Sequence, residues 1–255
     1  MPYLELEHSL LHYEEHGEGT PLMLVHGACE SSSFWKAQVD ELQKQHRLIL
    51  LNLPGHGQSA KPSDEVNISM YAEIVREAIY GLDLESPSLA GHSMGGAIAM
   101  TLAVEHPKLL GGLILANTGA KLGVLPEILA GLETDFAETI RDVVAPRELG
   151  NAHADQLLEW ISDEMVLTDP AVGFEDFLAC SRFDLRARIK EIHIPSLVIS
   201  GDQDKLTPVK WAVYLNENIA DSGLAVIQGT GHLTMLERPY AFNQVLSEFL
   251  SSYAV

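Results

Sequence analysis

The sequence predicts an α/β fold with a mostly parallel central sheet that helices cover on both faces. Short apolar runs that are typical of strands alternate with segments of helical periodicity along most of the 255 residues. Such alternation favours parallel strands joined by helices. Hydrophobic residues make up 46% of the chain, which is enough for a sizeable core. Between residues 119 and 190 no strand pattern is found, which predicts a helical insertion.

The expected strands are short apolar runs bounded by glycine, proline or polar residues. Residues 4–7 and 10–15 are expected to form an opening antiparallel pair, and the run Pro-Leu-Met-Leu-Val at 21–25 is expected to be buried on both faces. Further strands are expected at residues 47–51, 87–90, 112–117, 195–200 and 224–227. Helices are expected at residues 34–43, 70–81, 96–103, 209–218 and 240–250.

The insertion divides the chain into two predicted units. Its amphipathic stretches, such as 125–144 and 154–166, are separated by Pro146, Gly150 and Asp169-Pro170. We expect residues 1–118 and 191–255 to form the α/β core domain. Residues 119–190 are expected to form a helical cap over one end of the sheet, and they are called the cap below.

The most informative motif is Gly91-His92-Ser93-Met94-Gly95, which joins an expected strand to an expected helix. In that context Gly-x-Ser-x-Gly is typical of a nucleophile elbow. Glycines two residues before and after the serine are needed because side chains there would collide with the neighbouring strand or helix. The turn exposes the Ser93 hydroxyl at a helix N-terminus, where backbone N–H groups can hold a developing oxyanion.

A serine nucleophile needs a base and a group that orients the base, and both candidates follow expected strands. In open α/β sheets, function lies at the carboxyl ends of the strands. Three ends besides that of the serine carry suggestive chemistry: His26-Gly27-Ala28, Gly201-Asp202-Gln203-Asp204 and Gly229-Thr230-Gly231-His232. The chain order Ser, Asp, His is that of the α/β-hydrolases.

The chain resembles the capped esterases, lipases and C–C hydrolases of the α/β-hydrolase superfamily. The motifs that carry this resemblance are residues 25–27, 53–59 (Leu-Pro-Gly-His-Gly-Gln-Ser), 91–96, 201–208 and 231–232. The resemblance implies an α/β-hydrolase fold with a helical cap. It also implies that Ser93 is the nucleophile, His232 the general base and then acid, and Asp204 the residue that orients His232. Asp202 is interpreted as a turn residue.

By the same resemblance, the backbone N–H groups of Ala28 and Met94 are expected to form the oxyanion hole. Trp35, Phe136 and Trp160 are candidates for the substrate-binding lining, although core packing explains them equally well. Neither a cofactor nor a metal is expected. His8, His12 and His16 have helical spacing, but their segment is expected to be a hairpin, in which they would not converge on an ion.

Other residues with reactive side chains near the motifs are interpreted as structural. His26, His56 and His92 are expected to make hydrogen bonds within the strand ends and loops. Cys29 is expected to be a small packed hydrophobe rather than a reactive thiol.

The leading functional hypothesis is a serine carboxylesterase acting on small-molecule esters with short to medium acyl chains. A C–C bond hydrolase or an enol-lactonase could use the same three residues. A ligand-binding receptor on a hydrolase fold is the alternative outside enzymes.

The composition of the chain excludes some classes of binding partner. A net charge of −20 argues against nucleic acid and anionic membrane surfaces, because phosphate groups would be repelled. With two cysteines, no signal-peptide pattern and no long apolar run, we expect a cytoplasmic protein without stable membrane association. We expect a monomer or a homodimer.

Overall fold

The computed structural model describes residues 2–7, 9–62, 65–151 and 155–253. Its centre is an eight-stranded sheet in the order β1-β2-β4-β3-β5-β6-β7-β8. The strands are β1 (Tyr3–Glu5), β2 (Leu10–His16), β3 (Thr20–Val25), β4 (His46–Leu51), β5 (Ser88–His92), β6 (Gly112–Ala116), β7 (Ser196–Gly201) and β8 (Ser222–Ile227). The pairs β1–β2 and β2–β4 are antiparallel, and the other pairs, from β4 across to β8, are parallel. The predicted fold class is confirmed.

Along each inner strand, successive side chains point to opposite faces of the sheet, and both faces are buried. Met23 and Val25 of β3 face a core formed with α2 (Ile68–Gly81), α3 (Met94–Glu105) and α9 (Val209–Asn218). Leu22 and Leu24 face the second core, which includes side chains of α1 (Lys36–Leu42) and α11 (Pro239–Tyr253). Burial on both faces explains why these strands are continuous apolar runs.

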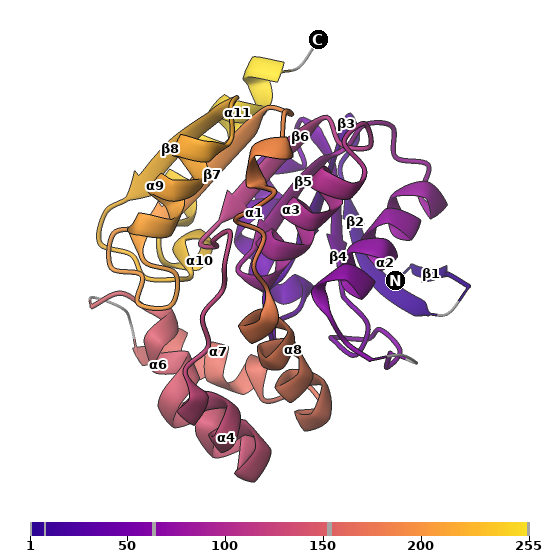
Figure 1. Ribbon diagram of the computed structural model, residues 1–255. Coiled ribbons are helices and arrows are strands. Elements are labelled where there is room, and N and C mark those ends of the chain that lie inside the picture. Colours follow the sequence, from indigo (N-terminus) through magenta and orange to yellow (C-terminus); the bar gives the residue numbers. More distant parts are fainter. Residues whose placement is uncertain (1, 8, 63–64, 152–154, 254–255) are drawn as a thin grey trace.

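Between β6 and β7 the described residues form helices, with one isolated bridge between Lys121 and Asp184. These helices are α4 (Pro126–Thr134), α5 (Phe136–Thr139), a π-helix (Ile140–Val144), α6 (Ala145–Glu148), α7 (Asp155–Met165), α8 (Pro170–Arg182) and a 3₁₀ turn (Ile189–Glu191). Figure 1 shows α4, α6, α7 and α8 gathered at one end of the sheet. The expected continuous stretch 125–144 is divided at Asp135, whose side chain caps α5 by accepting from the Glu138 N–H at 3.0 Å.

Two short helical segments of the core were not expected from the sequence. They are the 3₁₀ turn Ser32–Trp35 before α1 and helix α10 (Thr234–Glu237), which follows His232. No helix in the described part of the chain is both long and apolar enough to span a membrane.

Candidate active site

The strand β5, the turn at Ser93 and the helix α3 form a tight elbow. Ser93 has φ 50° and ψ −113°, a conformation that costs a non-glycine residue about 1–3 kcal/mol. A Cβ atom at Gly91 would collide with the carbonyl group of Gly95, and one at Gly95 would collide with the carbonyl oxygen of Val25. These contacts explain why the sequence has glycine on both sides of Ser93.

A buried hydrogen bond links the residues that follow β7 and β8. His232 Nδ1 lies 2.8 Å from Asp204 Oδ2. The Asp204 carboxylate also accepts hydrogen bonds from the Leu206 N–H at 2.9 Å, the Thr207 N–H at 2.8 Å, the Thr207 hydroxyl at 2.8 Å and the Asn117 amide at 2.9 Å. The Asp204 carboxylate is therefore held in place beside the imidazole from several directions.

Opposite charges shift both pKa values in this pair. Burial acts to raise the pKa of Asp204, but the charge of His232 and the hydrogen bonds to the carboxylate bring it well below its usual range. Burial acts to lower the pKa of His232, but the carboxylates of Asp204 and Glu148 raise it to about 9. The imidazole thus sits in a strongly negative environment.

Ser93 and His232 open onto one small cavity of about 60 Å³ beneath the cap helices. Its lining comes from the ends of the strands and from the cap. The lining residues are Ala28, Glu30, Ser93, Leu122, Gly123, Val124, Ile128, Glu148, Phe177, Cys180, Leu206, Thr207 and His232.

The loop after β3 reaches the same cavity through Ala28. The N–H groups on both sides of Ala28 are engaged in the protein interior. Gly27 N–H donates to Glu30 Oε2 at 2.7 Å, and Cys29 N–H donates to Asp176 Oδ2 at 3.1 Å. Met94, whose N–H is the other expected oxyanion donor, is the first residue of α3.

The aromatic candidates for substrate binding are not among the residues that line this cavity. Trp35 is fully buried, and its ring lies 6.5 Å from that of His92. Trp160 packs against Phe34, and Phe136 is also buried in the second core. The structure thus does not bring these three residues to Ser93.

The three histidines near the motifs make internal hydrogen bonds. His26 Nε2 accepts from the Leu53 N–H at 3.1 Å, and His56 Nε2 lies 2.8 Å from Asp176 Oδ2. His92 bridges Glu30 Oε2 and the His232 carbonyl oxygen, each at 3.0 Å. Cys29 is buried, and burial raises the pKa of its thiol well above the usual value, so the thiolate is disfavoured.

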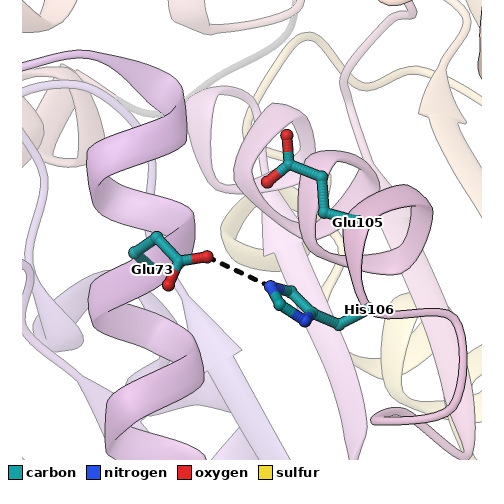
Figure 2. Close-up of side chains that lie close together, drawn as sticks. All are labelled: Glu73, Glu105 and His106. Atoms are coloured by element: carbon teal, nitrogen blue, oxygen red, sulfur yellow. Dashed lines mark hydrogen bonds and ion pairs between the residues drawn. The ribbon is translucent and has the colours of Figure 1, made fainter.

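Of the three histidines with helical spacing, His8 lies outside the described residues. A surface cluster of Glu73, Glu105 and His106 has the side-chain types of a metal site. In Figure 2, Glu73 is hydrogen-bonded to His106, and the Glu105 carboxylate lies near them with no hydrogen bond drawn to either. Glu73 also accepts a hydrogen bond from Arg76 Nε at 2.7 Å. Ion pairing with Arg76 and His106 therefore explains the position of Glu73 without a metal.

Three residues at the site were missed by sequence reasoning. Thr207 follows Asp204 by three positions, a spacing typical of an aspartate that accepts from the loop after it. Asn117 follows the end of β6, so the rule that function lies at strand ends could have indicated it. Glu148 comes from the cap, and nothing in its local sequence points to the cavity.

Comparisons with known proteins show the family to which the chain belongs. The profile of the alpha/beta hydrolase fold family matches residues 20–158, and that of the TAP-like proteins matches residues 181–254. The pimeloyl-[acyl-carrier protein] methyl ester esterase of Yersinia enterocolitica is 32% identical over 91% of this chain and 94% of its own. The chain therefore belongs to the alpha/beta hydrolase family, a family of hydrolases.

Solved structures are similar over nearly the whole chain. A thermophilic esterase has a TM-score of 0.88 at 29% identity, covering 99% of this chain and 98% of its own. The enol-lactonase from Burkholderia xenovorans LB400 has a TM-score of 0.93 at 27% identity, covering 98% of this chain and 100% of its own.

Proposed function

We propose that this protein is a serine carboxylesterase that cleaves small-molecule esters through an acyl-enzyme on Ser93. The observation that carries the proposal is the 2.8 Å hydrogen bond between His232 and Asp204 at a cavity that also contains the strained Ser93. A nucleophile, a base and an orienting carboxylate in this relation are the minimum set for acyl transfer.

In the proposed mechanism, His232 Nε2 takes the Ser93 proton as Oγ attacks the ester carbonyl carbon. Asp204 keeps the Nδ1–H tautomer and stabilises the imidazolium that forms. The N–H groups of Ala28 and Met94 hold the oxyanion, and each donor lowers the barrier by about 3 kcal/mol. The imidazolium then protonates the departing alkoxide. Water, deprotonated by His232, releases the acid and restores the Ser93 hydroxyl.

The cavity favours the short end of the acyl range. The cavity is small, at about 60 Å³, so in the present position of the cap it favours a short acyl group over a long one. We therefore infer a preference for acetyl to butyryl esters. The esterase relatives described above support ester hydrolysis as the reaction.

A lactone is the second candidate substrate, because the similarity to an enol-lactonase covers 98% of this chain. A lactone is a cyclic ester, so the same attack by Ser93 would open it.

The free cysteines Cys29 and Cys180 are both buried, which supports the proposed location in a reducing cytoplasm.

The first test is the hydrolysis rate of p-nitrophenyl esters from acetate to palmitate, with wild type beside Ser93→Ala. We expect a maximum at acetate to butyrate and a loss of about 10⁴-fold or more in Ser93→Ala. Folded wild type that hydrolyses lactones but no linear ester would replace the esterase proposal with a lactonase. Ser93→Ala with wild-type turnover would overturn both proposals.

A further inference from the structure

Glu148 places a buried carboxyl group in the cavity beside the proposed catalytic residues. The residue is 5% exposed, and its Oε2 atom has no hydrogen-bond partner among the described residues. The nearby Nε2 atom of His232 lies 4.0 Å from Glu148 Oε2, beyond hydrogen-bond distance. Nε2 is the atom that exchanges a proton with the leaving alcohol, so Glu148 is close to where that alcohol would lie.

Backbone hydrogen bonds fix this cap residue to the loop that carries His232. The Glu148 carbonyl oxygen accepts from the His232 N–H at 2.6 Å and from the Leu233 N–H at 3.2 Å. Glu237 joins the same two segments by accepting from the Gly150 N–H at 2.8 Å and from the Gly231 N–H at 2.6 Å. The backbone of Glu148 is therefore fixed beside His232, and this fixes where its side chain enters the cavity.

The surroundings of the Glu148 carboxyl group disfavour its ionised form. Glu30, a second carboxyl side chain, also lines the cavity, and the lining residues named above include neither lysine nor arginine. Burial raises the pKa of Glu148 to about 8, and the charges of Glu30 and Asp204 add to that rise while the charge of His232 opposes it. A buried polar group without a hydrogen-bond partner is destabilising, and a ligand that pairs with it can recover this loss.

We propose that Glu148 is a specificity-determining residue that accepts an ammonium N–H on the alcohol part of the ester and rejects a carboxylate in its place. This inference rests on the proposed esterase function, since it names the substrate class of the same site. Above about pH 8, where the Glu148 carboxyl group is ionised, an ammonium group would gain an opposite charge beside His232. A carboxylate would meet like charges in a cavity with little water to screen them.

The experiment uses three acetate esters of almost the same shape. At pH 8, where the Glu148 carboxyl group begins to ionise, they are 2-(dimethylamino)ethyl acetate, most of which is still cationic, its neutral carbon analogue 3-methylbutyl acetate, and the anionic 3-acetoxypropionate. The measured quantity is kcat/KM for each ester relative to the neutral one. We expect wild type to prefer the cationic ester and to disfavour the anionic ester, each by about tenfold or more, and Glu148→Gln to lose most of both preferences.

Glu159→Gln is the matched control, because it removes one exposed carboxylate from the cap helix α7 outside the cavity. It should keep the wild-type ratios. Equal ratios in wild type and Glu148→Gln would overturn the inference, even if the neutral ester is hydrolysed well. If wild type hydrolyses none of these esters, the proposed function fails, and the inference is then decided by binding.

Binding is measured as the rise in Tm caused by the product alcohols, which stabilise the folded state if they bind it. We expect 2-(dimethylamino)ethanol to raise the Tm of wild type more than 3-methyl-1-butanol does. Glu148→Gln should abolish that difference. A difference that is absent in wild type, or that persists in Glu148→Gln, contradicts the role of Glu148 independently of turnover.

Discussion

At the residue scale, the site depends on side chains that hold the orientation of others. His232 has its Nδ1 atom against Asp204, and Thr207 and Asn117 hold the carboxylate of Asp204 from two further sides. Asn117 also donates to the Gly231 carbonyl oxygen at 3.1 Å, which joins the β6 end to the loop of His232. The geometry of the imidazole is therefore fixed before any substrate arrives, as preorganised catalysis requires.

Substitution of Asp204 tests this orientation. Asp204→Asn should lower kcat by about 10⁴-fold, because an amide can donate to Nδ1 and so stabilise the wrong imidazole tautomer. Asp202→Asn is the matched control, since Asp202 accepts from the Gly229 N–H at 2.6 Å instead of contacting the imidazole. Steady-state kinetics on p-nitrophenyl acetate should find this variant within a few fold of wild type. Equal losses in the two variants would contradict the assignment of Asp204.

The pH profile tests the charge of Glu148. The reactive form of His232 is neutral, so kcat/KM should rise with pH until the imidazole is deprotonated, near pH 9. Glu148 raises the pKa of His232, and removal of its charge in Glu148→Gln must lower that pKa. The acid limb of kcat/KM should then move to lower pH by about one unit.

The control for the pH profile is again Glu159→Gln, whose acid limb should coincide with that of wild type. An acid limb of Glu148→Gln that stays in place, or moves to higher pH, would show that Glu148 does not act on the imidazole.

The sequence was sufficient to predict those site residues whose neighbours in the chain form a recognisable motif. Ser93 is flanked by the glycines that its turn requires, and Asp204 and His232 each follow a strand and a glycine. Glu148 could not be found in this way, because its place in the cavity depends on how the cap sits on the core.

At the element scale, strands were easier to predict than cap helices. A parallel strand buried on both faces must be almost entirely apolar, so its sequence reveals it. A cap helix needs only one apolar stripe, and the stripe does not say what it packs against. The stretch from 126 to 148 changes from α-helix to π-helix and back, which apolar periodicity does not indicate.

The cap helix α8 is tied to the core by one buried carboxylate. Asp176 accepts from the Tyr71 hydroxyl at 2.8 Å and the Cys29 N–H at 3.1 Å, and lies 2.8 Å from His56 Nε2. This link connects α8, α2 and the loop of the proposed oxyanion hole. Loss of one of the hydrogen bonds to Asp176 should therefore lower the free energy of unfolding of the whole chain.

Tyr71→Phe removes the hydroxyl and keeps the ring. Because the lost hydrogen bond ends on a carboxylate, we expect a decrease of about 2 kcal/mol in the free energy of unfolding, measured in urea. Tyr80→Phe makes the same change on the same helix at a side chain that is 59% exposed. It should stay within about 0.5 kcal/mol of wild type. Similar effects of the two substitutions would show that the link to Asp176 contributes little.

At the scale of the whole molecule, the strand order brings distant segments to one edge. Strands β3, β5, β6, β7 and β8 are neighbours in the sheet, although they span residues 20–227 of the chain. Because they are parallel, their carboxyl ends meet at the edge where Ser93, Asp204 and His232 lie. The sheet order thus explains how the candidate site is assembled, and the cap then closes it to a small volume.

The most direct test of the central claim is to trap the acyl-enzyme. Wild type mixed with p-nitrophenyl acetate, quenched in acid within the first turnovers and digested, should yield the peptide containing Ser93 with one added acetyl group. Ser93→Ala should give no acetylated peptide and no turnover above the uncatalysed rate. Catalytic release of p-nitrophenol by wild type without acetyl on Ser93, or undiminished turnover by Ser93→Ala, would contradict the proposed mechanism.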